Sequence, residues 1–180
     1  QLGRSNDPSW VRDAQALWRS SGKSLPDQCD GPFAQLAAQG GLTDALRWER
    51  FDLAADAQQS GVMRSIARSM ASPADAALGN TYASYMDAAD GSASSWAKTT
   101  RSRLVASAAL AKLGKAAPDR AEALLPGVAS ALGFNETERG RVLYQVALWT
   151  VASYLPGAQQ RLANVPLASY DASLHEWQVR

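Results

Sequence analysis

The sequence predicts an all-α protein of about ten helices with no sheet. Alanine, the strongest helix former, accounts for 35 of the 180 residues. Valine, isoleucine and threonine, which favour strands, together number only 16, too few for a large sheet. Proline, glycine and helix-capping residues recur at short intervals between amphipathic segments. The short turns between these segments favour antiparallel helix pairs.

Capping and breaking residues define the helices in the first half of the chain. Asp7 followed by Pro8 is a typical helix start, because proline fits the first helical position. A loop rich in glycine, proline and serine follows at 21–32, and Gly40-Gly41 ends the next short helix. Apolar residues at spacings of three and four then indicate a longer helix from Thr43. The expected helices cover 8–19, 33–39, 43–59, 62–70 and 73–87.

The second half follows the same pattern. Gly91 breaks the chain, Trp96 lies on a short expected helix, and Pro118-Asp119 opens another. Asn135-Glu136-Thr137 matches an acceptor sequence for N-glycosylation, but it also makes a good helix start, which is the interpretation we prefer. The other expected helices cover 100–113, 118–132 and 135–155, followed by short ones near 159 and 173.

The sequence also contains one weak internal repeat, which we call the Leu-Pro-Gly echo. Leu-Pro-Gly begins at Leu125 and again at Leu155, thirty positions later, and each copy has a leucine seven residues further on. A period of this length occurs in helical repeat arrays. The alanine content suits either a repeat array or a compact bundle, since small side chains let helices approach closely.

Charge and composition exclude several classes of function. The formal net charge of +1 argues against a general nucleic-acid-binding protein, which carries a clear basic excess. The longest apolar run, 142–155, is too short and too polar for a membrane span. With one histidine, His175, and one cysteine, Cys29, we expect no metal site and no cofactor. Gly22-Lys23 lacks the preceding glycine and strand of a phosphate-binding loop.

The best candidates for ligand contact are Trp48 and its neighbours Arg47 and Arg50. An aromatic ring can stack on a sugar, and arginine beside it suits a glycan that carries carboxylates. The alternative is that Trp48 packs between helices and that each arginine pairs with a carboxylate on a neighbouring helix. The glutamates lie on helix faces or in first turns, and we expect none of them to be catalytic.

The sequence resembles the helical superhelix of the soluble lytic murein transglycosylases of Gram-negative bacteria. The resemblance covers most of the chain, in family order. It extends to the segment 121–132 and to the ending 176–180. The residues that carry it most specifically are Leu17-Trp18, Ser21-Gly22-Lys23-Ser24, Pro26, Cys29-Asp30, Phe33, Gly41-Leu42-Thr43, Leu46, Trp48 and Arg50.

The resemblance implies an α-α superhelix, a solenoid of antiparallel helix pairs. The family's enzymes cleave the MurNAc–GlcNAc bond of peptidoglycan and leave a 1,6-anhydromuramoyl end. Their catalytic glutamate lies in a lysozyme-like domain marked by Glu-Ser and Gly-Leu-Met-Gln, and neither string occurs here. We therefore carry over no catalytic residue, and whether this chain alone is an enzyme stays open. The superhelix is thought to position glycan strands for that domain.

The resemblance also sets expectations for location, partners and limits. It implies the periplasm, with glycan strands and a catalytic domain of the same polypeptide as partners. It implies that Cys29 is half of a disulfide whose other cysteine lies upstream of Gln1. The helical ending without a cap suggests that 1–180 is part of a single superhelical domain, truncated at both ends and without the catalytic domain. The competing hypothesis is a helical-repeat adaptor that binds another protein.

Overall fold

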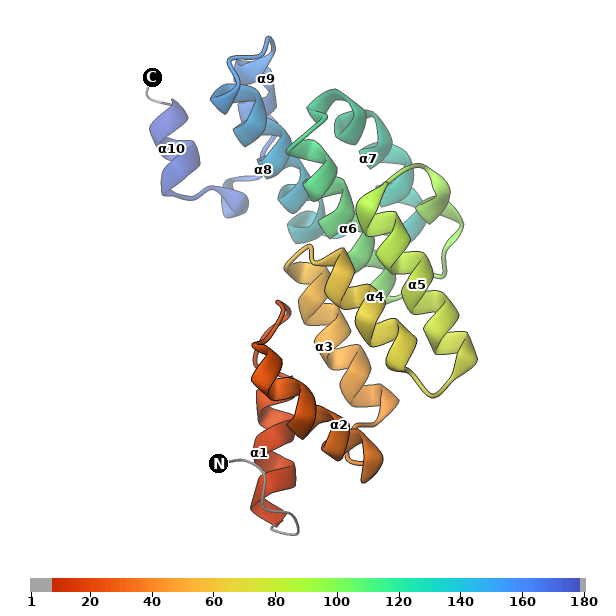
Figure 1. Ribbon diagram of the computed structural model, residues 1–180. Helices are drawn as coiled ribbons and strands as arrows, with labels where there is room; N and C mark the ends of the chain where they lie inside the picture. The colour runs from red at the N-terminus through yellow and green to blue at the C-terminus, as the bar shows by residue number, and fades with distance from the viewer. Residues whose placement is uncertain (1–7, 179–180) are drawn as a thin grey trace. The chain divides into compact units, whose positions relative to one another are not determined.

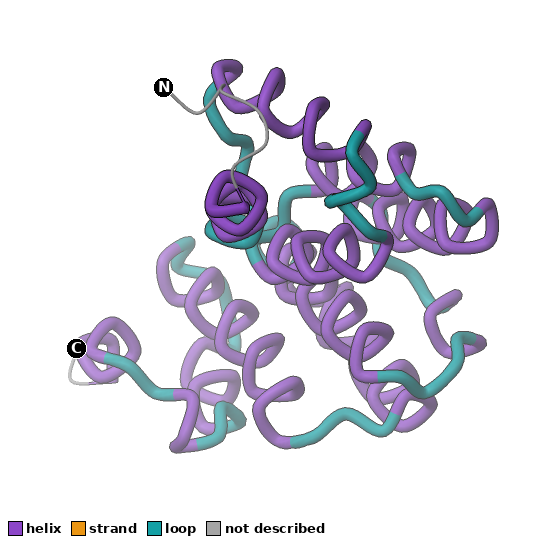
Figure 2. Tube along the Cα trace, turned by 90° about the horizontal axis from the view of Figure 1, so that it is seen from below, coloured by secondary structure: helices purple, strands orange, loops and turns teal. Residues whose placement is uncertain are grey.

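The computed structural model describes residues 8–178, and in this part of the chain every regular element is a helix. Figure 2 shows these helices joined by short loops. The chain divides into two compact units between Ser84 and Tyr85, a boundary that falls within a helix. No helix among the described residues is long and apolar enough to cross a membrane.

From residue 8 onward, the first unit contains four α-helices and most of a fifth (Figure 1). Helices α3 and α4 lie side by side, and α2 packs on α1. A short 3-10 helix, η1, leads into α2. The elements are α1 (Pro8–Trp18), η1 (Asp27–Cys29), α2 (Asp30–Ala38), α3 (Asp44–Asp56), α4 (Ser60–Ser69) and α5 (Pro73–Asp87).

The second unit is built on three mutually packed helices, α6, α7 and α8. The smaller elements η2, α9 and η3 pack against this group. The elements are η2 (Ser92–Ser95), α6 (Thr100–Gly114), α7 (Pro118–Leu132), α8 (Glu136–Ala152), α9 (Ala158–Ala163), η3 (Leu167–Ser169) and α10 (Ala172–Gln178).

The predicted all-α class and number of helices are confirmed for the described residues. The caps at Thr43 and Asn135 are also present. The Asn135 side chain accepts from the Glu138 amide, and Glu138 accepts from the Asn135 amide. Ser60, expected to end one helix, instead begins α4. Trp96 follows a 3-10 helix.

The echo at Leu125 and Leu155 does not mark a structural repeat. The first copy lies inside α7, where Pro126 is part of the helix. The second copy lies between α8 and α9, where Gly157 has a φ of 80°. The same three letters thus occupy a helix interior in one place and a turn in the other.

A different regularity does recur, at the ends of α2, α3, α7 and α8. In each case one residue just past the helix is left-handed, and the next amide donates to the carbonyl five positions earlier at 2.9 Å. This is the Schellman arrangement, which satisfies carbonyls that the helix end leaves open. The left-handed residues are Gly40, Gln58, Gly133 and Tyr154.

The core of the first unit forms around α3. Phe51 is fully buried and packs edge-on against Trp48, with ring centroids 4.9 Å apart. The Tyr82 ring of α5 lies 6.3 Å from the same phenyl ring. Gly79 lets α5 approach closely, since a Cβ there would lie 2.8 Å from the Ala67 side chain of α4. One aromatic residue therefore ties α3 to α5.

The core of the second unit uses small side chains for close packing. Nine of the 15 residues of α6 are buried, and four of these are alanines. At Gly114 a Cβ would lie 3.2 Å from a methyl group of Val146 on α8. The alanine content of the sequence thus serves helix-to-helix contact as well as helix formation.

Arg161 of α9 connects three helices of this unit. Its guanidinium donates to Glu122 on α7 at 2.8 and 3.0 Å and to the Thr150 hydroxyl on α8 at 3.0 Å. It also pairs with Asp119 at the start of α7. The Arg161 side chain is only 12% exposed, so these partners satisfy a charge that is largely withdrawn from water.

Asp44 links the start of α3 to the connection between α4 and α5. Its carboxylate accepts from the Ala71 amide at 3.0 Å and the Ser72 amide at 2.9 Å, and it pairs with Arg47 at 2.9 Å. These interactions, led by the two backbone amides, hold the pKa of Asp44 below its ordinary value of 3.8.

We expect Asp44→Asn to lower the free energy of unfolding at pH 7 by about 1–2 kcal/mol, through loss of charge-assisted bonds to two amides. A carboxylate with a depressed folded-state pKa stabilises the fold above its unfolded pKa, and this contribution disappears as pH falls through the folded pKa. Urea midpoints of wild type and variant should therefore converge below pH 4. The exposed Asp13→Asn is the control, and a constant difference between pH 7 and pH 2.5 would contradict the prediction.

Candidate functional site

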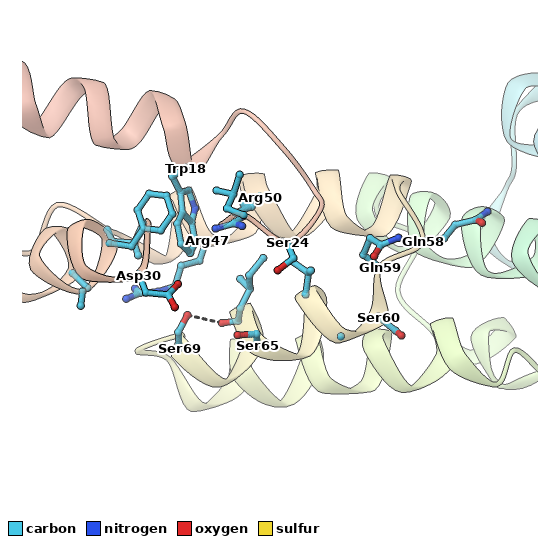
Figure 3. Close-up of a pocket in the computed structure, with 18 residues that line it drawn as sticks. Trp18, Ser24, Asp30, Arg47, Arg50, Gln58, Gln59, Ser60, Ser65 and Ser69 are labelled. Atoms are coloured by element: carbon cyan, nitrogen blue, oxygen red, sulfur yellow. Dashed lines mark hydrogen bonds between the residues drawn. The ribbon is translucent and has the colours of Figure 1, made fainter. Parts of the chain in front are cut away.

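A cavity of about 680 Å³ opens among α1–α4 of the first unit. Figure 3 shows charged and aromatic side chains at one end, near Arg50 and Asp30, and the amides of Gln58 and Gln59 at the other. Its volume is in the range of small-molecule sites in proteins. The polar side chains that line it are Ser24, Asp30, Arg47, Arg50, Gln58, Gln59, Ser60, Ser65 and Ser69.

Arg50 is the most unusual of these residues, because it is charged and only 7% exposed. Its guanidinium carbon lies 4.4 Å from the centre of the Trp18 ring and 5.7 Å from that of Phe33. These contacts are in the range of cation–π attraction. The Trp18 indole N–H donates to the Leu46 carbonyl at 2.9 Å, which fixes the ring beneath the charge.

The Arg50 guanidinium donates few hydrogen bonds to the rest of the protein. One N–H donates to the Lys23 carbonyl at 3.4 Å, near the limit for such a bond, and the buried Nε has no partner. Burial lowers the pKa of Arg50, while the nearby Cys29 and Asp30 oppose that shift. A buried guanidinium with so few acceptors is costly unless another group compensates.

Arg47 lies one helical turn before Arg50 on α3 and faces the same cavity. Its guanidinium pairs with Asp44 at 2.9 Å, and its side chain is 11% exposed. The buried Nε of Arg47 also has no partner. The cavity therefore has two largely buried guanidinium groups with unused hydrogen-bonding capacity.

The loop that covers one side of the cavity is held by Gly22. A Cβ at this position would lie 2.1 Å from the Leu53 carbonyl oxygen and 2.6 Å from the Ala54 nitrogen, both in the backbone of α3. Only glycine permits this approach. The loop then carries Lys23, whose carbonyl meets Arg50, and Ser24, which lines the cavity. Gly22 therefore has a packing role in this loop.

The structure brings Arg47 and Arg50 together at the cavity but does not bring Trp48 there. Trp48 is 8% exposed and packs against Phe51. Consecutive helix positions lie about 100° apart, so Trp48 follows Arg47 onto a different face of α3. Trp18, from another helix, supplies the aromatic wall instead.

Cys29 lies at the end of η1, half-buried, and is a free thiol in the described chain. Ser65 and Ser69, which sequence reasoning missed, lie one turn apart on α4 and both line the cavity. Their spacing of four marks one helix face. That signal is weak by itself, because serine is common on exposed helices.

No protein-family model matches the chain, and no curated protein matches it significantly. A solved structure does: an inactive mutant of the lytic transglycosylase Slt from Pseudomonas aeruginosa matches 99% of this chain with a TM-score of 0.67 and 25% identity. The structural neighbours of this chain are soluble lytic transglycosylases. The resemblance predicted from the sequence is thereby confirmed.

Two further solved structures have the same fold. The 70-kDa soluble lytic transglycosylase from Escherichia coli matches 95% of the chain with a TM-score of 0.64 and 23% identity. A complex of the 70-kDa soluble lytic transglycosylase with bulgecin A matches 94% with a TM-score of 0.67 and 22% identity. These neighbours confirm the predicted α-α superhelix as the fold class.

The match is to part of each lytic transglycosylase. This chain spans 29% of the Pseudomonas chain, 25% of the Escherichia coli chain and 34% of the chain in the bulgecin complex. The matched part is the helical region of these enzymes.

Proposed function

We propose that this chain is part of the superhelical scaffold of a peptidoglycan lytic transglycosylase and positions glycan strands for a catalytic domain outside the chain. The observation that carries the proposal is the match of 99% of the chain to the Slt enzyme at 25% identity. The resemblance of the Leu17–Arg50 segment to the family supports it independently. The proposal includes a periplasmic location and a disulfide between Cys29 and an upstream cysteine.

The lining of the cavity supports a glycan ligand. Serine hydroxyls and glutamine amides can exchange hydrogen bonds with sugar hydroxyl and acetamido groups. The apolar wall, which includes Trp18, Phe33 and Ile66, suits the less polar face of a sugar ring. We therefore place the proposed glycan contact at Arg47 and Arg50. The Trp18 ring would pack against the sugar, as the sequence had suggested for Trp48.

The proposal predicts that the purified chain is retained on insoluble peptidoglycan sacculi in a sedimentation assay. Filling the cavity mouth with Ser65→Tyr should reduce the bound fraction severalfold, because Ser65 is exposed and lines the cavity. The matched control is Ser130→Tyr, an exposed serine on α7 far along the chain. It should leave retention unchanged.

Sedimentation, analysis of the released products and capture of protein partners together distinguish a scaffold from an enzyme and from an adaptor. Anhydromuropeptides released by the chain alone would contradict a purely positioning role. Absence of retention, together with a stoichiometric protein partner, would favour the helical-repeat adaptor. Equal losses with Ser65→Tyr and Ser130→Tyr would contradict the placement of the glycan in this cavity.

A further inference from the structure

We infer that the Arg47–Arg50 end of the cavity binds a single carboxylate carried on a hydroxylated ligand. The inference that a carboxylate binds here depends only on the cavity. The inference that this carboxylate belongs to peptidoglycan rests on the proposed function. The key observation concerns Arg50. This residue is only 7% exposed and lines the cavity, and its Nε has no hydrogen-bond partner.

The guanidinium groups favour a planar anion. Arginine presents its N–H groups as a rigid fork that matches the two oxygens of a carboxylate. Arg50 donates one long hydrogen bond, to the Lys23 carbonyl, and Arg47 forms one ion pair, with Asp44. Both guanidinium groups therefore keep N–H donors that no protein acceptor uses, including the two Nε atoms. The Trp18 ring beneath Arg50 restricts the orientation of that fork.

The charge of the surroundings favours one negative charge rather than two. Arg47 and Arg50 contribute two positive charges to the lining, and Asp30 contributes one negative charge. Asp44 further offsets Arg47 from outside the lining. These four charges balance, so a phosphate dianion would add two uncompensated negative charges beside Asp30, whereas a single carboxylate adds one. We therefore favour a carboxylate over a phosphate.

The neutral end of the cavity defines the body of the ligand. Gln58, Gln59 and Ser60 lie at the end away from Arg50 (Figure 3), whereas Ser69 of α4 lies beside Asp30 at the charged end. Amides and hydroxyls at a distance from the charged end suit a ligand that carries hydroxyl or acetamido groups beside its carboxylate. An N-acetylmuramic acid residue has this composition, whereas a short peptide with a free carboxyl end offers the carboxylate and amides without the hydroxyl groups.

Three probes test the inference by calorimetric titration of the wild-type chain. N-acetylmuramic acid carries a sugar body with a lactyl carboxylate, and N-acetylglucosamine is the matched sugar without it. Diacetyl-Lys-D-Ala-D-Ala carries a carboxylate on a peptide. We expect N-acetylmuramic acid to bind at least about tenfold more tightly than N-acetylglucosamine, because charge-assisted hydrogen bonds are lost with the carboxylate.

Two variants assign the binding to the arginines. Arg50→Met retains much of the side-chain volume without the charge, and it should lower affinity for N-acetylmuramic acid about tenfold or more. Arg47→Met is the second variant and keeps the test valid if Arg50→Met does not fold. The control is Arg68→Met, an exposed residue of α4 that does not line the cavity. It should leave affinity unchanged.

Each result has a definite meaning. Preferred binding of the peptide, which has no hydroxyl group, would overturn the hydroxylated ligand and assign the carboxylate to peptide rather than sugar. Equal binding of both sugars, binding that survives Arg50→Met and Arg47→Met, or no binding of any probe would overturn the inference. Sacculus retention unaffected by the arginine variants would leave the proposed function standing without the pocket. Carboxylate binding without retention would leave the pocket standing without the proposed function.

Discussion

Replacing Phe51 by alanine is expected to lower the free energy of unfolding by about 4 kcal/mol. Phe51 is fully buried on α3 and contacts the Trp48 ring, with Tyr82 of α5 close by. Truncation removes the transfer free energy of a phenyl group and leaves a cavity that neighbouring rings cannot fill. Because Gly79 already brings α5 close to this ring, little collapse is available to reduce the cost.

Urea denaturation followed by circular dichroism measures this loss, and hydrogen exchange locates it. Exchange should accelerate throughout the described residues of the first unit. Leu53→Ala on the same helix is the control, since Leu53 is 40% exposed. It should cost less than about 1 kcal/mol. A similar loss from both variants would show that Phe51 is not the centre of the packing that the structure describes.

The Gly22→Ala variant is expected to lose about 3 kcal/mol of stability. The added methyl group would lie 2.1 Å from the Leu53 carbonyl oxygen, and that oxygen belongs to a helix backbone that cannot shift without breaking its own hydrogen bonds. The loop must therefore move away from α3. Because Lys23 and Ser24 move with it, the cavity changes shape and its ligand affinity should fall as well.

Gly31→Ala provides a matched control for this glycine effect. Gly31 lies in α2, and a Cβ there meets nothing within 4 Å. Alanine is a better helix former than glycine, so this variant should be neutral or gain up to about 1 kcal/mol. The thermal midpoint should therefore fall for Gly22→Ala and stay the same or rise for Gly31→Ala. If both lose stability equally, the close approach of the loop to α3 is not the cause.

Most of the fold could be predicted because its signals are local. The helix starts at Pro118 and Asn135 are as expected, since caps and prolines act on the residues next to them. The turn at Gln58 was missed because its left-handed residue is not a glycine. The Leu-Pro-Gly echo was misleading because Pro126 is held inside α7.

The candidate site was only partly predictable, because it depends on which helix faces meet. Arg47 and Arg50 carried a visible signal, a pair of cations near an aromatic residue, and both line the cavity. The aromatic partner was assigned to the neighbour in sequence, Trp48, whereas the ring under Arg50 is Trp18. A contact between residues 32 positions apart, such as this one, is set by the packing of α1 on α3 and leaves no local pattern.

The anchoring of α9 has a consequence for how the second unit unfolds. A helix of six residues has almost no stability of its own, because nucleation alone costs more than its few hydrogen bonds return. Its order therefore depends on Arg161, which reaches Glu122 and Thr150, and on the buried Leu162. Helix α9 should detach before α6, α7 and α8 separate, as a small subglobal opening that exposes the 153–165 segment to proteases while these three helices stay folded.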